Sequence, residues 1–178
     1  IMSSDWSSDV CSSDLLDSID AENNQFQFAD LFFGYSRNNS YDRKYFTINS
    51  PATSIQFNTV QGWNADLDVT YRQVKDEDNT RWWDVGGSVN YGFADKRLRG
   101  TLRYRHRLEQ KNRTLLTLAG GIDAVQFNPA NPIGETLNSL YSLWGRENYM
   151  KLYDKAFGRV GFERELVNGV FLRTGIEY

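Results

Sequence analysis

Cysteine, proline and histidine are scarce in this chain of 178 residues, which holds one cysteine, three prolines and one histidine. A single cysteine, Cys11, excludes an intrachain disulfide, and a lone histidine, His106, does not supply the usual zinc ligand set. No run of about 18 apolar residues is present, so the sequence predicts no transmembrane helix. With a net charge of −3, the chain also lacks the basic balance typical of nucleic-acid-binding proteins.

Catalytic motifs are missing as well. The sequence contains no serine nucleophile elbow, no P-loop and no HExxH metal motif. The acidic segment "DEDN" (76–79) lacks the glycine and the distal glutamate of an EF-hand, which favours a solvated loop tip. The sequence therefore predicts a protein that is not an enzyme and that needs no metal or cofactor.

The first residues differ in character from the rest. The stretch "SSDWSSDVCSSDL" (3–15) repeats Ser-Ser-Asp, and its back-translation resembles a synthetic sequencing adapter. The alternative is a Ser/Asp-rich flexible arm that cannot bury enough surface to fold. We expect residues 1–15 to be a non-native, disordered stretch and exclude them from the fold argument. Both ends of the chain are then expected to be arbitrary, and any export signal would lie upstream.

Aromatic residues are abundant, at 15% of the chain. Such a composition suits β-strands, and from about residue 25 most segments alternate with the period of two that a strand requires. Short polar turns separate them, which predicts an antiparallel meander. The expected strands lie in 25–36, 44–49, 54–73, 81–93, 98–108, 113–127, 156–166 and 170–178.

One segment breaks this pattern. Residues 128–155 form a connection too long for an ordinary turn, and Leu137, Leu140, Tyr141 and Trp144 fall at helical spacing. We expect a short helical insert near 134–153. It is the best functional candidate, either as a plug in a lumen or as a surface that binds a partner; the alternative is a segment that shields a barrel edge. The candidate residues are Tyr141, Trp144, Tyr149 and Tyr153.

Alternating strands fit either a membrane barrel with lipid on the apolar face or a soluble barrel or sandwich with a core there. Several segments alternate over about ten residues, whereas soluble strands average about 5–6. Many glycines lie inside strands, where a soluble core would lose packing. Aromatic residues also begin and end the apolar faces, as in the girdles of a membrane barrel. We therefore favour the membrane barrel and predict a girdle of Trp63, Tyr71, Trp83, Tyr91 and Phe93.

The polar faces carry a row of arginines opposite acidic residues. Basic rings line anion pores, so the row could form an anion path. The favoured alternative is a charge lattice across the lumen, because acids are available on other strands. The residues concerned are Arg99, Arg103, Arg105 and Arg107, with Asp66, Asp68 and Asp84, and further acids at Glu163, Glu165 and Glu177.

Several sequence motifs resemble those of a known family: "FNTVQGWN" (57–64), "YGFADKRLRGTLRY" (91–104), "GGIDAVQFNPANPI" (120–133) and "NSLYSLWGRENYMKLYDK" (138–155). The chain resembles, over about 25–178, a family of large bacterial outer-membrane proteins of unknown function. The resemblance implies an N-terminal carboxypeptidase regulatory-like domain, absent here, and a C-terminal β-barrel of which this chain is a part. It brings no catalytic residues.

We therefore expect an all-β fold, an antiparallel up-and-down meander forming part of a transmembrane β-barrel. Residues 16–178 would be an incomplete barrel domain in the bacterial outer membrane, with a structural or transport-related role. Its expected partners are outer-membrane lipid and an envelope protein bound through 128–155, but no nucleic acid. The alternative function is a soluble β-barrel or sandwich that acts as a binding module.

Overall fold

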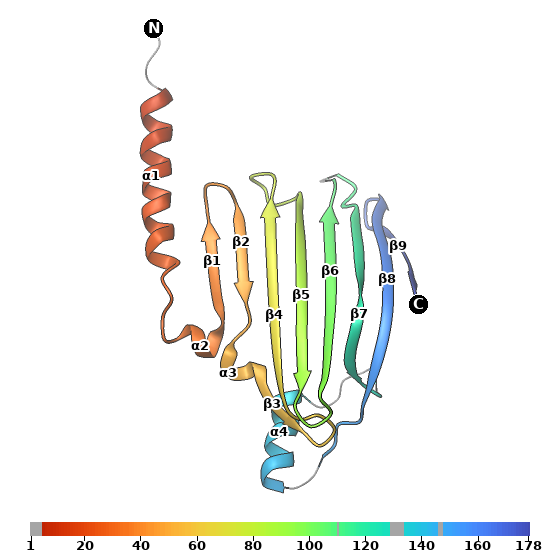
Figure 1. Cartoon of the computed structure of the whole chain (residues 1–178). Helices are drawn as coiled ribbons and strands as arrows, with labels where there is room; N and C mark the ends of the chain where they lie inside the picture. Colours follow the sequence, from red (N-terminus) through yellow and green to blue (C-terminus); the bar gives the residue numbers. More distant parts are fainter. Residues whose placement is uncertain (1–4, 110, 129–133, 146–147) are drawn as a thin grey trace.

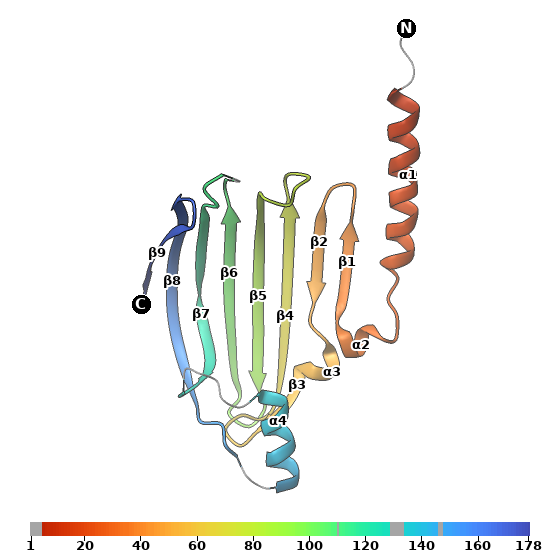
Figure 2. The ribbon, with the colours of Figure 1, turned by 180° about the vertical axis from the view of Figure 1, so that it is seen from behind.

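The computed structural model describes residues 5–109, 111–128, 134–145 and 148–178, which form one antiparallel sheet with short helical pieces (Figure 1 and Figure 2). The helices within these residues are α1 (Asp5–Asn23), α2 (Asp30–Phe33), α3 (Pro51–Ser54) and α4 (Glu135–Leu140), followed by a π-helical turn, η1 (Tyr141–Gly145). The strands are β1 (Tyr35–Asn39), β2 (Lys44–Ile48), β3 (Ile55–Asn58), β4 (Gly62–Val74), β5 (Trp82–Gly92), β6 (Arg97–Arg107), β7 (Leu115–Gln126), β8 (Leu152–Val167) and β9 (Val170–Glu177).

The strands follow one another across the sheet in the order β1-β2-β4-β5-β6-β7-β8-β9, and β3 pairs with β4. Every described pairing is antiparallel. The predicted all-β antiparallel meander is therefore confirmed. The sheet is open, with β1 and β9 as its two edges (Figure 1). We call the end of the sheet that carries α4 the lower end and the opposite end the upper end.

Two short strands share one long neighbour. β2 pairs with the upper part of β4 and β3 with its lower part, so together they replace a single strand. Asn49 lies at the interruption: its side-chain oxygen accepts a hydrogen bond from the backbone N–H of Asp68 at 2.9 Å, and its own N–H donates to the Asp68 carbonyl at 3.0 Å. Asn49 thus satisfies backbone groups of β4 where the ladder is broken.

β8 ends one residue beyond the predicted strand 156–166. It continues to Val167, and Asn168 and Gly169 form the turn of the last hairpin. Gly169 has a φ of 83°, a left-handed conformation that glycine adopts without a steric penalty.

The prediction of a strand over 25–36 is wrong for most of that segment. The chain instead makes a turn into α2, and β1 begins only at Tyr35. The carboxylate of Asp30 accepts a hydrogen bond from the N–H of Gln27 at 2.7 Å, and the N–H of Gly34 donates to the Asp30 carbonyl at 2.9 Å. These local bonds use backbone groups that a strand would have directed at a neighbour, so they favour the helical turn.

The disorder predicted for 1–15 also differs from the structure where the structure describes that stretch. Residues 5–15 are the first part of α1, which continues to Asn23 across the predicted domain boundary at residue 16. An α-helix satisfies its backbone within the segment, so it can form without packing on a core. α1 stands beside the sheet in both views, and the carboxylate of Asp20 accepts hydrogen bonds from the N–H and hydroxyl of Ser40 at 2.5 and 2.7 Å (Figure 1 and Figure 2). The non-native origin of 1–15 stays a prediction.

The helical insert is shorter than the predicted 134–153. Helical structure ends at Gly145, and β8 begins at Leu152, so Tyr153 is a strand residue opposite Val125. Residues 129–133, 146 and 147 lie outside the described part of the chain. Pairing with β7 explains the difference, since it captures the end of the segment that helical periodicity alone had assigned to the insert.

Burial in this sheet is inverted relative to a water-soluble domain. Among the residues whose burial is described, the buried apolar side chains are Val74, Trp82 and Met150, and most other buried residues are polar or charged. The apolar face of the long strands is exposed instead; Leu102, in the middle of β6, is 61% exposed. Buried polar residues include Asn58, Gln61, Asn64, Asp84, Arg99, Thr114, Asn138, Ser139 and Ser142.

Candidate functional site

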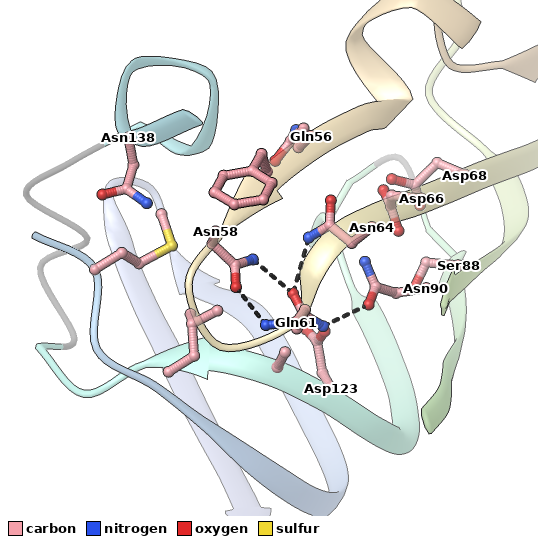
Figure 3. Close-up of a pocket in the computed structure, with 14 residues that line it drawn as sticks. Gln56, Asn58, Gln61, Asn64, Asp66, Asp68, Ser88, Asn90, Asp123 and Asn138 are labelled. Atoms are coloured by element: carbon pink, nitrogen blue, oxygen red, sulfur yellow. Dashed lines mark hydrogen bonds between the residues drawn. The ribbon is translucent and has the colours of Figure 1, made fainter. Parts of the chain in front are cut away.

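A polar pocket lies at the lower end of the sheet, with a cavity volume of about 260 Å³. The β3–β4 hairpin, β5, β7 and the segment that follows α4 contribute its walls (Figure 3). It is enclosed by residues far apart in the sequence because the lower ends of these strands meet the insert there. The lining residues are Gln56, Phe57, Asn58, Gln61, Asn64, Asp66, Asp68, Ser88, Asn90, Asp123, Ala124, Asn138, Met150 and Leu152.

Gln61 is the centre of an amide network in this pocket (Figure 3). Its side-chain oxygen accepts hydrogen bonds from the side-chain amides of Asn58 and Asn64, both at 2.8 Å, and its own amide donates to Asn90 at 2.9 Å. The side-chain oxygen of Asn58 accepts from the backbone N–H of Gln61 at 2.7 Å, which fixes the hairpin turn. These bonds tie the β3–β4 hairpin turn to β5 through side chains as well as through the backbone ladder.

One acceptor of the network has no described partner. The side-chain oxygen of Asn64 is buried without a hydrogen bond, in a residue only 5% exposed. In Figure 3 it points away from Gln61, on the side of Gln56 and Asp66. A buried acceptor without a partner costs about 1–3 kcal/mol, so this atom indicates a place where a donor belongs.

Acidic side chains form another wall of the pocket. Asp66 and Asp68 come from β4, and Asp123 comes from β7. Arg99, which lies near this wall, donates from its Nε to Asp154 and from its Nη2 to Asp95, both at 2.5 Å. Three carboxylates therefore line one cavity.

β7 is distorted beside the pocket, although regular alternation with Ala119 and Gly121 already places Asp123 on the polar face. Gly121 has a φ of 145°, and a side chain on it would collide with the Gly100 carbonyl, so only glycine fits there. Two positions later the alternation of the strand is broken, since the neighbours Asp123 and Ala124 both line the pocket. In a regular strand they would point to opposite faces.

The insert closes the apolar side of the pocket. The Ser139 hydroxyl accepts a hydrogen bond from the N–H of Phe57 at 3.0 Å, which ties α4 to β3. The Asn138 side chain donates to Asn148 at 2.9 Å and accepts from the N–H of Tyr149 at 3.1 Å. These bonds hold the buried Met150 against the cavity.

Some residues of the predicted charge lattice form ion pairs, while the lattice across a lumen stays a prediction. Asp84, 1% exposed, accepts hydrogen bonds from its cross-strand partner Arg105 at 2.7–3.1 Å. Arg99 pairs with Asp95 and Asp154, which sequence reasoning did not select, while Asp66 and Asp68 line the pocket instead. Asp154 pairs with Ala124, and alternation alone would put both on the apolar face, so its bond to Arg99 was not predictable from the sequence. The strand acids Glu163 and Glu177 pair with Arg173 and with Arg159, and Glu165 lies near Arg113.

Of the predicted arginines, Arg105 and Arg107 lie near the upper end, together with Arg72 of β4, while Arg103 lies near the middle of β6. The guanidinium carbons of Arg72, Arg105 and Arg107 lie 4.3, 5.4 and 5.9 Å from the centre of the Trp82 ring, in cation–π range. The Nε atoms of Arg72 and Arg107 are buried and have no described hydrogen-bond partner. Arg103 lies over Gly86, where the missing side chain leaves room for its guanidinium.

The predicted girdle residues fall into two rows on the apolar face. Tyr71 and Trp83 lie near the upper end, with ring centres 5.4 Å apart. Trp63, Tyr91 and Phe93 lie at the lower end, where the last two rings are 5.1 Å apart. Sequence reasoning missed further members that share this placement at strand ends: Phe57 packs on Trp63, Tyr104 on Trp83, and Phe127 on Tyr153.

The predicted insert residues do not line the pocket. Tyr141 and Tyr149 form an edge-to-face pair with ring centres 5.7 Å apart, and Trp144 is 84% exposed. Tyr153 belongs to β8 and to the lower aromatic row. The insert therefore presents aromatic surface outward while its amide and apolar side chains face the pocket.

Two aspartates in turns stabilise the ends of strands. Desolvation opposes ionisation of Asp76, but hydrogen bonds from the hydroxyl and N–H of Thr80 and the N–H of Arg81 outweigh it, and the pKa of Asp76 lies below its ordinary value. Asp95 follows the same logic: desolvation is outweighed by hydrogen bonds from Arg99 and Arg97, which lower its pKa. In their ionised form, both carboxylates stabilise these turns through the hydrogen bonds that they accept.

In the described part of the chain, no helix has the length and apolarity needed to cross a membrane. The same residues contain no group of three or more His, Cys, Asp or Glu side chains placed to hold a metal ion.

Comparison with known protein families gives a match. Residues 29–178 match the C-terminal domain of a family of unknown function (DUF5686). No curated protein and no solved structure matches the chain. The matched range covers β1 to β9, the insert and every pocket residue, and it leaves out α1. The chain therefore belongs to this family of unknown function, through its C-terminal domain.

Proposed function

We propose that this domain is part of the wall of a β-barrel in the bacterial outer membrane, with a structural or transport-related role and no catalysis. The apolar face meets lipid and the polar face lines the lumen. The observation that carries the proposal is the inverted burial: buried polar side chains on one face and exposed apolar side chains on the other. In water an apolar surface of that extent would be a liability, whereas lipid accommodates it.

The dimensions of the strands support the same role. The central strands β4 to β7 have 11 to 13 residues. A strand of about ten residues, tilted by about 40°, spans roughly 25 Å, the height of the apolar band of outer-membrane barrels. The two aromatic rows lie at the two ends of this span, where interfacial girdles occur.

The open edges and the insert complete the proposal. β1 and β9 would each pair with further strands to close a barrel, because an unpaired edge inside lipid is unfavourable. By the resemblance in sequence, the full protein would also carry an N-terminal carboxypeptidase regulatory-like domain. The exposed aromatic residues Tyr141 and Trp144 would bind an envelope protein partner at the lower end, and outer-membrane lipid would cover the apolar face.

Neighbouring tryptophans offer a direct test. Trp83 lies on the apolar face and Trp82 on the polar face of the same strand. Variants that keep one of the two, with every other tryptophan replaced by phenylalanine, are refolded into vesicles of brominated phospholipid. We expect bromine to quench the fluorescence of Trp83 strongly and that of Trp82 weakly, because quenching requires contact with the acyl chains.

Migration in gels supplies the second readout. The folded chain should run differently before and after heating in detergent, as membrane barrels do. Equal quenching of the two tryptophans, together with a stable monomer in buffer without detergent, would contradict the proposal and favour a soluble barrel or sandwich that acts as a binding module.

A further inference from the structure

Three arginines on the polar face of the sheet have no acidic partner. Arg72 belongs to β4, Arg103 and Arg107 belong to β6, and within the described residues none of the three forms an ion pair or a side-chain hydrogen bond. Asp84 lies opposite Arg72 in the register, but its carboxylate is bound to Arg105 by three hydrogen bonds. One carboxylate therefore faces several guanidinium groups, and the upper half of this face has an excess of positive charge.

Trp82 positions two of these arginines. The guanidinium carbons of Arg72 and Arg107 lie 4.3 and 5.9 Å from the centre of its ring, and they come from the strands on either side of β5. Their Nε atoms are buried and have no described acceptor, so stacking on the ring, and not hydrogen bonding, holds the two side chains. Their terminal Nη groups are neither buried nor bonded to a described residue, which leaves these donors open to a ligand.

Arg103 brings a third guanidinium group toward β4. A Cβ placed on Gly86 would lie 3.1 Å from Nη2 of Arg103 and 3.3 Å from the Thr70 hydroxyl oxygen. The exposed Arg103 side chain therefore crosses β5 where that strand has no side chain, and it ends near Thr70, the residue before Arg72 on the polar face of β4. Cations from β4 and β6 thus flank the polar face of β5.

The chemistry of these donors selects a phosphate group. A guanidinium binds oxyanions through pairs of N–H donors, and stacking on an aromatic ring leaves the edge that carries those donors free. A carboxylate offers its two oxygens in one plane, whereas a phosphate dianion offers acceptors in several directions and can accept from guanidinium groups of two strands at once. Its charge also offsets the repulsion between these groups.

We propose that the upper half of the polar face binds a phosphate group through the guanidinium groups of Arg72, Arg103 and Arg107. Trp82 fixes the donors of the first and the last, and Gly86 gives the second its path across β5. The site does not require lipid on the apolar face, so its failure and the failure of the proposed barrel are separate outcomes. A free phosphate and the phosphate of a lipid head group share this chemistry.

The test is calorimetric titration of the chain with inorganic phosphate at low ionic strength, in micelles of dodecyl maltoside, a detergent without phosphate. We expect saturable binding of one phosphate per chain. Arg72→Lys and Arg107→Lys keep the charge but remove the fork of donors and its stacking, and each should weaken binding about tenfold. The matched control Arg37→Lys changes an exposed arginine of β1 and should leave the affinity unchanged.

A second arm separates the two sources of phosphate. Dihexanoyl phosphatidic acid is added to the same micelles and its affinity is compared with that of inorganic phosphate. Tighter binding of the lipid identifies a head group as the ligand, and tighter binding of inorganic phosphate identifies a free phosphate.

Three results would overturn the proposal: no saturable binding of either compound, unchanged affinity in both Arg72→Lys and Arg107→Lys, or an equal loss in Arg37→Lys, which would mean a diffuse effect of charge. If the variants do not fold, the unmodified chain decides. Burial protects the Nε–H protons of Arg72 and Arg107 from exchange, and their NMR resonances should shift with phosphate and stay in place with chloride at equal ionic strength. Resonances that do not respond to phosphate would refute the site.

Discussion

The two faces of β5 have the same backbone, the same neighbours and opposite environments. On one face Asp84 is buried and paired with Arg105, and Ser88 lies 2.6 Å from the Thr101 hydroxyl. On the other, Val89 and Tyr91 are exposed. In a soluble sheet the apolar face is covered by a second layer, and here the polar face is the one that interactions within the chain satisfy. Binary pattern alone thus does not tell inside from outside; the location of buried polar contacts does.

The largest loss of stability is expected from a charge placed on the apolar face. Leu102→Arg puts a guanidinium at the middle of β6, and we expect it to lower the free energy of unfolding in a bilayer by about 2–4 kcal/mol, the cost of arginine near the bilayer midplane. Urea titration of the chain in phospholipid vesicles, followed by tryptophan fluorescence, measures this loss.

The matched control introduces the same residue one position away. Thr101→Arg lies on the polar face beside Ser88 and should have a much smaller effect. If the two variants lost equal stability, the two faces would not differ in environment.

The next effect concerns the buried ion pair of the polar face. Asp84→Asn leaves the Arg105 guanidinium without its charged partner, and we expect a loss of about 1.5–3 kcal/mol, typical of a hydrogen bond to a charged group. The same urea titration applies. In a double-mutant cycle with Arg105→Leu, the losses should be less than additive; strict additivity would mean that the pair contributes nothing beyond its separate members.

A smaller effect is expected from the upper aromatic row. The tilted pair of Tyr71 and Trp83 should contribute a coupling energy of about 0.5–1.5 kcal/mol, measured with Tyr71→Leu, Trp83→Leu and the double variant. The corresponding cycle for Tyr71 with Trp82, on opposite faces of the sheet, should give a coupling near zero. Comparable coupling in both cycles would argue against a row confined to one face.

The smallest effect on stability is expected in the β4–β5 loop, and it depends on pH. Because the folded pKa of Asp76 lies below its unfolded value, its ionised form stabilises the β4–β5 loop above the ordinary aspartate pKa of about 3.9. That stability should be lost as the pH falls through the folded pKa. Amide hydrogen exchange of Thr80 and Arg81 against pH measures it. Asp76→Asn should abolish the dependence and Glu77→Gln should keep it; a profile unchanged by Asp76→Asn would assign the dependence to another group.

Alternation predicted β5, β6, β7 and β9 because each of these strands has one polar and one apolar face. The single strand predicted over 54–73 is wrong, since the chain turns between β3 and β4 there, and β8 begins before the predicted residue 156. The prediction also failed at 25–36, where aromatic richness resembled a strand but Asp30 and Gln27 close a local turn. Helical spacing placed the end of the insert near Tyr153, because it carries no information on the pairing of Tyr153 with Val125.

The pocket was harder to foresee. The density of amides in "FNTVQGWN" (57–64) was a usable signal, because Asn58, Gln61 and Asn64 sit within seven positions of one another. Asn138 was not, since its place depends on the bond between Ser139 and Phe57. Such features arise from tertiary contacts that no local window contains.

The hydrogen bond between Phe57 and Ser139 joins residues 82 positions apart. Contacts of that separation form late, because closing a long loop costs chain entropy before any contact compensates it. The meander can grow hairpin by hairpin, each strand docking on the one before it. The pocket, by contrast, cannot exist until β7 is in place and the chain has returned to β3. The pocket therefore forms late in folding, and an intact pocket would distinguish a completely folded sheet from a partly assembled one.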